Sequence, residues 1–139
     1  MKLKITITIS AILLIILLTA AGVVLYPKYQ ERKQAEIYEK VKANNQLFIA
    51  MVINEFDKDK TQKAETIAQK VCDAMNQKEK NPYNSEDLAF SFDTNCKGCH
   101  AVEYDNDLSM VILTTYDKEG NLGARTVIKP PSYVTYFKD

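Results

Sequence analysis

The segment "KYQERKQAEIYEKVKANNQLFIAMVINEF", residues 28–56, decides the fold because it predicts a long helix with one apolar face. It is rich in Glu, Lys, Gln and Ala and contains no glycine or proline, a composition that favours helix. Apolar residues recur in it at helical intervals between charged residues, so one stripe is expected to pack against another part of the protein. The residues of this stripe are Tyr38, Val41, Phe48, Val52 and Phe56.

The preceding run "ITITISAILLIILLTAAGVVLYP", residues 5–27, contains no charged residue. As a helix it is long enough to cross a hydrocarbon core of about 30 Å. We therefore predict that residues 1–27 form a membrane anchor and that the helix continues, with a bend, through Pro27. The part that follows is long enough to be exported whatever its flanking charge. The sequence predicts a single-pass protein with residues 28–139 outside the cytoplasm.

A cleavable signal peptide is the alternative interpretation of the same run. "MKLK" would be its basic region, the residues up to Leu18 its apolar region, and "TAAG" would allow cleavage after Ala21. The apolar run continues to Leu25, which favours the membrane span. Both interpretations export residues 28–139 to an oxidising compartment, where disulfides persist.

Residues 57–87 are expected to form a short second helix and a loop. "DKDKT", residues 57–61, ends the first helix, and "NQKEKNPYNSED", residues 76–87, is a polar stretch with two turn signals. Between them, apolar residues repeat at i, i+3, i+4, i+7, i+8 and i+11, which predicts an amphipathic helix that ends near Asn76. Its apolar face consists of Ala64, Ile67, Ala68, Val71, Cys72 and Met75.

From Leu88 onward the apolar period changes from 3.6 to 2, and β-branched and aromatic residues dominate. The turn segments "NDLS" and "DKEGN" separate some of these runs. Residues 88–139 therefore predict an antiparallel sheet of three to five strands, whose apolar face the long helix would cover. The fold class is α+β, with residues 28–139 as one globular domain. The predicted strands cover residues 88–92, 101–104, 110–116, 124–128 and 133–137.

This order of elements resembles that of type IV pilins and of the pseudopilins of type II secretion. Residues 11–45, "AILLIILLTAAGVVLYPKYQERKQAEIYEKVKANN", look like their N-terminal helix, including Pro27 and Tyr29, and "NPY" at residues 81–83 is similar to a tripeptide in their loop. The resemblance implies a non-enzymatic subunit of a type IV pilus or type II secretion-like filament. Its partners would be other pilin-like subunits, bundled through the helix, and the bacterial inner membrane before assembly at the cell surface.

Two positions differ from the pattern of that family. Ile5 stands where the family has the glycine before its cleavage point, and Ser10 stands where it has a glutamate that pairs with a neighbouring subunit. One class of minor pseudopilins also lacks this glutamate and is placed at the filament tip. A carboxylate in lipid is costly unless it is paired, so a subunit with none above it can dispense with the residue.

Residues 96–100, "CKGCH", match the C-x-x-C-H pattern by which c-type haem is attached. Cys96 and Cys99 would bind the porphyrin, His100 would ligate the iron, and Met110 is the one methionine that follows. A small cytochrome c is mostly helical, whereas the 39 residues after His100 read as strands. We therefore expect no cofactor and keep a membrane-anchored monohaem electron-transfer protein as the alternative, beside a single-pass anchored domain of unknown role.

A disulfide is the favoured interpretation of the cysteines. Cys96 could pair with Cys99 across a turn, or Cys72 with either of them, and the sequence does not choose between these connectivities. A bond from Cys72 would close a loop of roughly 25 residues and stabilise the fold by about 3 kcal/mol. A zinc site that adds His100 to these thiols is less favoured, because structural zinc usually takes two ligand pairs.

Acidic residues near two predicted turns are weak candidates for a Ca²⁺ site. Asp105 and Asp107 lie in "EYDND" and Asp117 lies in "DKEGN", but solvated turn residues are the favoured interpretation. No catalytic set or phosphate loop is recognisable, so we do not expect an enzyme. With 18 basic and 18 acidic residues, the chain also gives no reason to expect nucleic acid as a partner.

Overall fold

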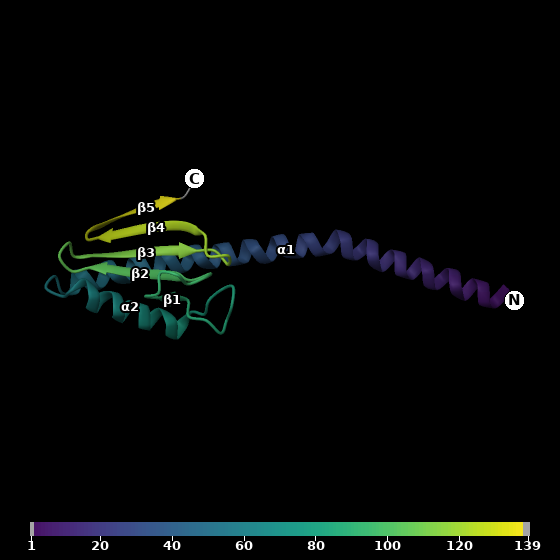
Figure 1. The fold of residues 1–139 in the computed structure, drawn as a ribbon, viewed down its shortest axis with the longest axis horizontal. Helices are drawn as coiled ribbons and strands as arrows, with labels where there is room; N and C mark the ends of the chain where they lie inside the picture. Colours follow the sequence, from purple (N-terminus) through teal and green to yellow (C-terminus); the bar gives the residue numbers. More distant parts are fainter. Residues whose placement is uncertain (1, 138–139) are drawn as a thin grey trace. The chain divides into compact units, whose positions relative to one another are not determined.

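The computed structural model of the chain describes the backbone of residues 2–137 and the side chains of residues 14–137. The backbone divides into two compact units, Met1–Tyr38 and Glu39–Asp139. The first unit is the first part of a long helix, and the second unit holds the rest of that helix with all other elements (Figure 1). The elements are α1 (Lys2–Lys58), α2 (Ala64–Lys78), β1 (Phe90–Ser91), β2 (His100–Asp105), β3 (Met110–Tyr116), β4 (Leu122–Lys129) and β5 (Ser132–Phe137).

Helix α1 runs without interruption through Pro27, as the sequence predicts. It ends at Lys58, where the predicted breaker "DKDKT" begins to form a turn of its own. There the Asp59 carboxylate accepts hydrogen bonds from the Thr61 amide (2.9 Å) and the Thr61 hydroxyl (2.6 Å). A short polar side chain that bonds the backbone two residues ahead favours a turn over continued helix.

Within the part of the chain that the structure describes, no helix combines the length and the apolar content that a membrane crossing needs. The side chains of residues 1–13, which belong to the predicted anchor, lie outside the described residues. The membrane anchor over residues 1–27 therefore stays a prediction.

The five strands form one sheet in the order β1-β2-β3-β4-β5. Strands β2 to β5 pair antiparallel, as the sequence predicts, and their bounds lie within two residues of the expected ones. The expectation of a wholly antiparallel sheet is wrong for β1, which has only two residues and pairs parallel with β2. The reason is the loop over residues 92–99, which carries the chain back to the same end of the sheet, whereas a tight hairpin would reverse it.

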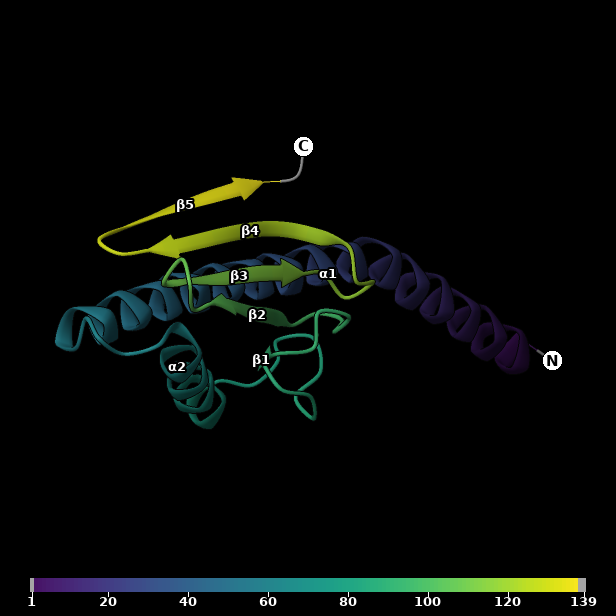
Figure 2. The ribbon, with the colours of Figure 1, turned by 60° about the vertical axis from the view of Figure 1, so that its left-hand side comes forward.

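The core of the second unit lies between α1, α2 and one face of the sheet (Figures 1 and 2). All six apolar residues predicted for α2 are buried. In the α1 stripe Phe48, Val52 and Phe56 are buried as predicted, but Tyr38 is 65 % exposed, so that part of the prediction is wrong. The packed part of α1 begins only near Asn44, which is also buried.

Candidate functional site

The "CKGC" turn contains a disulfide between Cys96 and Cys99. This is one of the connectivities that the sequence left open. Cys99 is buried, whereas Cys96 is half-buried. Gly98, between them, has φ +66°, and a Cβ at this position would lie 2.7 Å from Cδ2 of Tyr83. A left-handed backbone in close contact with an aromatic ring requires glycine here.

Backbone hydrogen bonds attach the turn to its neighbours on both sides. The Gly98 amide donates to the Asp117 carbonyl (2.7 Å), and the Tyr116 amide donates to the Cys99 carbonyl (3.0 Å). The His100 amide donates to the Ala89 carbonyl (2.8 Å). These backbone bonds therefore fix the position of the turn against the sheet, while the disulfide closes the turn itself.

His100, the residue after the second thiol, is a core residue. Its ring stacks on Phe90 with centroids 4.6 Å apart, and Phe90 stacks on Phe48 of α1 at 5.1 Å. The ring atom Nδ1 lies 3.3 Å from the Thr115 hydroxyl, which also bonds the Asn45 amide group at 3.1 Å. Burial lowers the pKa of His100 from 6.5 to about 4, so the imidazole is neutral near pH 7.

Three buried polar atoms have no hydrogen-bond partner among the described residues: Nε2 of His100, Nδ2 of Asn44 and the hydroxyl of Thr114. An unpaired buried polar atom costs about 1–3 kcal/mol. His100 therefore sits in an environment that tolerates its neutral form and resists its protonation.

The residues of the alternative haem site do not come together. The two thiols are bonded to each other, and the ring that would ligate iron is enclosed in the core. His100 pairs with Thr115 at one end of the β2–β3 ladder and Met110 pairs with Asp105 at the other end. The five steps along β3 from Met110 to Thr115 span roughly 17 Å of strand, which is too far for two ligands of one iron. These residues do not fit a haem group.

The acidic candidates also lie apart, at opposite ends of β3. The Asp105 carboxylate accepts from the amides of Asp107 and Leu108, both at 2.9 Å, and so stabilises its own turn. Asp117, the residue after β3, stabilises its own turn in the same way. Its carboxylate accepts hydrogen bonds from Asn121, which lower the pKa of the carboxyl. Across the described residues, no group of three or more acidic, cysteine or histidine side chains is placed to hold a metal ion.

The third cysteine, Cys72, is free and buried on the apolar face of α2. Burial and the neighbouring Asp73 raise the pKa of its thiol to about 11. Its neighbour Asn76 links α2 to β1, because the Asn76 amide donates to the Phe90 carbonyl (2.8 Å) and accepts from the Phe90 amide (2.9 Å). The disulfides considered for Cys72 are not formed.

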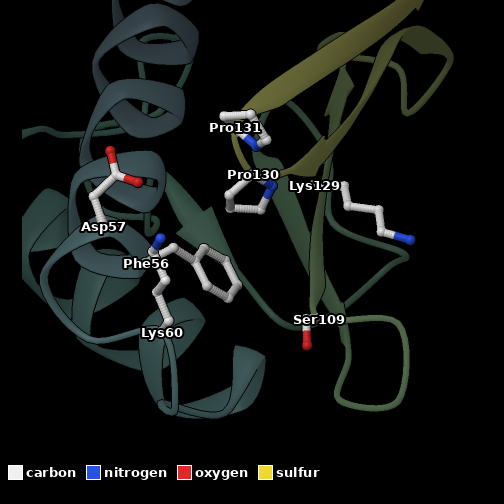
Figure 3. Close-up of a pocket in the computed structure, with 7 residues that line it drawn as sticks. All are labelled: Phe56, Asp57, Lys60, Ser109, Lys129, Pro130 and Pro131. Carbon is white, nitrogen blue, oxygen red and sulfur yellow. The ribbon is translucent and has the colours of Figure 1, made fainter.

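A pocket of about 340 Å³ opens between the end of α1 and the turn that joins β4 to β5. Figure 3 shows the ring of Phe56 beneath Pro130, while the ammonium group of Lys129 points away from them. The polar side chains that line it are all exposed, so it lacks a buried polar group to fix a ligand. Its lining residues are Phe56, Asp57, Lys60, Ser109, Lys129, Pro130 and Pro131.

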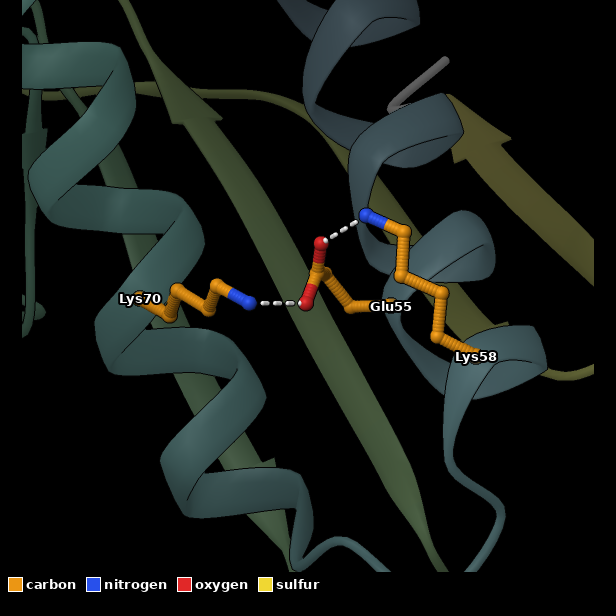
Figure 4. A network of polar contacts seen from close by, with 3 residues as sticks. All are labelled: Glu55, Lys58 and Lys70. Carbon is orange, nitrogen blue, oxygen red and sulfur yellow. Dashed lines mark hydrogen bonds and ion pairs between the residues drawn. The ribbon is translucent and has the colours of Figure 1, made fainter.

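A charged cluster joins the two helices of the second unit. The Glu55 carboxylate of α1 accepts hydrogen bonds from Lys58 at 2.7 Å and from Lys70 of α2 (Figure 4). These bonds, first that of Lys58 and then that of Lys70, lower the pKa of Glu55. The bond from Lys70 holds α1 against α2, whereas that from Lys58 lies within the last turn of α1.

The first unit, which consists of the N-terminal part of α1, has a large exposed apolar surface. Each of its large apolar residues from Leu14 to Tyr26 is more than half exposed. Thr19 is the one hydrogen-bonding side chain between Leu14 and Leu25, and its hydroxyl donates to the carbonyls of Ile15 (3.0 Å) and Ile16 (2.9 Å). The exposed residues are Leu14, Ile15, Ile16, Leu17, Leu18, Val23, Val24, Leu25 and Tyr26.

Sequence reasoning missed the polar residues that organise the core, namely Asn45, Asn76 and Thr115. Each of them bonds an atom on a different element, and no local pattern marks such a pair. It also missed that β5 is exposed on both faces, because the alternation of a strand does not tell where the covering helix ends.

The chain has an α+β fold with a long N-terminal helix, a short second helix and a five-stranded sheet. No family model matches the chain, and no curated protein or solved structure matches it either.

Proposed function

We propose that this protein is a pilin-like subunit that is anchored through residues 5–27 and assembles with other subunits through the same helix. In this proposal the sheet domain lies outside the cytoplasm and forms the outer surface of the assembly. The role is structural and not enzymatic. The anchor holds each subunit in the bacterial inner membrane until assembly transfers its apolar helix to the interior of a filament.

The observation that carries the proposal is the uncovered apolar surface of α1 between Leu14 and Tyr26. A helix that is apolar all round is stable in lipid or among similar helices, whereas in water it exposes a surface that drives association. The absence of charge from Ile5 to Pro27 supports the same interpretation.

Thr19 adds independent support. Its hydroxyl is turned back onto the carbonyls of its own helix, which satisfies the group without water. Serine and threonine within a helix commonly form this bond, and here it leaves no hydroxyl that requires water. The order of the elements, a long helix followed by a sheet that its second part covers, is compatible with the resemblance to pilins and pseudopilins.

A charge placed in the apolar run tests the anchor. Leu17→Glu puts a carboxylate near the middle of the run, which costs about 2.5–3.5 kcal/mol in a membrane helix and predicts a loss of membrane retention of roughly 100-fold. The matched control is Gln34→Glu, which adds the same group at another exposed position of α1, outside the run. The full chain, expressed in bacteria, is measured in membranes washed with alkaline carbonate. Equal retention of both variants would contradict the anchor.

A cysteine at Val24 separates a filament subunit from a plain anchored domain. Val24 is 57 % exposed, so in a helix bundle this position meets neighbouring subunits. Val24→Cys is expected to form intersubunit disulfides, while Gln46→Cys, on an exposed part of α1 in the second unit, is not. Monomers only, from both variants, would leave a single-pass anchored domain. An intact mass of the extracted chain also reports cleavage after residue 5 or 21 and any bound haem.

A further inference from the structure

We infer that β5 is a self-association strand, which pairs antiparallel with β5 of a second copy of this chain about a two-fold axis at Thr135. The paired strands would join the two sheets into one. This inference does not rest on the proposed filament role, because it concerns the second unit and needs no membrane.

Large apolar side chains of β5 are exposed on both faces of the sheet. Tyr133 and Phe137 are 53 % and 76 % exposed on one face, and Val134 and Tyr136 are 52 % and 60 % exposed on the other. The helices that cover the other strands do not cover this one. Each face of β5 therefore has an apolar surface that a partner along the strand edge would bury.

The edge of β5 is open and carries no charge. β5 is the last strand in the order, so among the described strands it pairs only with β4. Every second residue of such a strand turns its N–H and C=O groups away from its neighbour. Natural edge strands usually block this edge with lysine, proline or a bulge, but Ser132–Phe137 contains none of them. The opposite edge, β1, offers only two residues.

The sequence of the strand favours a second copy as the partner. When two copies meet about a two-fold axis normal to the sheet, paired residues lie on the same face, so their numbers differ by an even count. With Thr135 on the axis, Tyr133 faces Phe137 of the other copy and Val134 faces Tyr136. Such aromatic and β-branched pairs stabilise a ladder by about 0.2–1 kcal/mol each.

The two neighbouring allowed registers, about Val134 and about Tyr136, are poorer, because neither places all four exposed apolar residues against one another. With Val134 on the axis, Ser132 would face Tyr136, Tyr133 would face Thr135, and Phe137 would face no strand residue. The register about Thr135 alone places all four exposed apolar residues against one another. Thr135, the residue on the axis, already has a hydrogen-bond partner within its own chain, because its hydroxyl lies 2.9 Å from that of Thr126 on β4.

The size and charge of the surface suit self-pairing. Aromatic side chains bury 150–250 Å² each, so at the exposed fractions of these residues three aromatic rings and Val134 offer at most about 400–500 Å² in each copy. Two copies therefore bury at most about 1,000 Å², which is the size of a weak, reversible interface. Two charged residues of β4 pair with β5: Arg125 with Tyr136 and Lys129 with Ser132. Arg125 is within 3.7 Å of Glu103, so its charge is partly neutralised, and Lys129 lies at the end of the strand.

A cysteine on the proposed axis tests the inference directly. In the full chain in detergent, Thr135→Cys places two thiols on Cα atoms about 4.5–5.5 Å apart, within the range of a disulfide. Ser132→Cys is the matched control, since in this register its two copies lie roughly 20 Å apart. The expected result is a covalent dimer of Thr135→Cys on a non-reducing gel and none of Ser132→Cys. The wild type gives the baseline, because Cys72 is buried and Cys96 is bonded to Cys99.

A charge on the strand provides the second measurement. Val134→Lys in the Thr135→Cys background is expected to reduce the crosslinked fraction at least tenfold, because lysine blocks pairing at an edge strand and the two ammonium groups would repel each other across the axis. Leu108→Lys is the control, since Leu108 is 51 % exposed but lies in the turn between β2 and β3. Equal crosslinking at positions 132 and 135, or no effect of Val134→Lys, overturns the inference. Monomeric Thr135→Cys overturns it too, and leaves a strand of a different protein as the occupant of this edge.

Discussion

Helix α1 has two parts that differ in what surrounds them. In the first unit, the apolar residues from Leu14 to Tyr26 are all exposed. In the second unit, Phe48 and Val52 are completely buried against α2 and the sheet. Both parts belong to one continuous helix. The second part of α1 therefore stabilises the sheet domain, whereas the apolar side chains of the first part remain exposed.

The largest contrast is expected from alanine in each part. Phe48→Ala removes a fully buried ring that stacks on Phe90, and a truncation of this kind costs about 3–5 kcal/mol. Leu17→Ala removes an exposed side chain, so the free energy of unfolding of the sheet domain should change by less than about 0.5 kcal/mol. Denaturant unfolding followed by tyrosine fluorescence measures both. Equal losses of stability in the two variants would show that the first part of α1 contributes to the stability of the sheet domain as much as the second part does.

The two glycines Gly98 and Gly22 give the next contrast, with opposite signs. Gly98→Ala should destabilise the sheet domain by about 2–3 kcal/mol, because it combines a left-handed backbone with a contact against Tyr83. A Cβ at Gly22 meets nothing within 4 Å, so Gly22→Ala should lower the free energy of the helical form of α1 by about 0.5–1 kcal/mol. Thermal unfolding by circular dichroism separates the two. A stabilised Gly98→Ala would show that the turn is not held as described.

Acid should destabilise the buried part through His100. Because the pKa of His100 is about 4 in the folded protein and 6.5 when exposed, the unfolded chain binds a proton first as the pH falls. This contribution to stability is complete above pH 6.5 and decreases toward pH 4, with a loss of about 2 kcal/mol between pH 7 and pH 5. His100→Phe keeps the stack on Phe90 and removes the titration. A variant with the same pH dependence as wild type between pH 7 and pH 5 would refute the assignment.

The smallest effect is expected at Glu55. Glu55→Gln keeps the size of the side chain but weakens its bonds to Lys58 and Lys70, so Tm should fall slightly. The effect should vanish at low pH, because hydrogen bonds from the two lysines lower the pKa of Glu55 and its contribution is lost as the pH falls through that pKa. Glu31→Gln, on the exposed first part of α1, is the control and should leave Tm unchanged.

Local periodicity accounts for what the sequence predicts well. The spacing of Ala64, Ile67 and Val71 identifies both the second helix and its buried face. Alternation of β-branched residues likewise locates β3, whose bounds are Met110–Tyr116 as expected. These patterns involve residues that are close in the sequence, so they can be recognised before the fold is known.

The remaining features depend on contacts between distant segments. The separation of Asp105 from Asp117 follows from the length of β3, and the parallel pairing of Phe90 with His100 follows from the path of a loop. Tyr38 continues the helical pattern of Phe48 but lies beyond the packed part of α1. Periodicity describes which face is apolar, and it does not describe how far the covering partner extends.

Burial of the Cys72 thiol decides how three cysteines sort into pairs as the chain oxidises. Cys96 and Cys99 are separated by two residues, so their encounter is far more frequent in the unfolded chain than a loop closure from Cys72. Once α2 packs, Cys72 is inaccessible and, with its pKa raised to about 11, protonated, so it does not attack the finished bond. The thiol that remains is a built-in reporter, since a maleimide reaches it only in molecules that have opened.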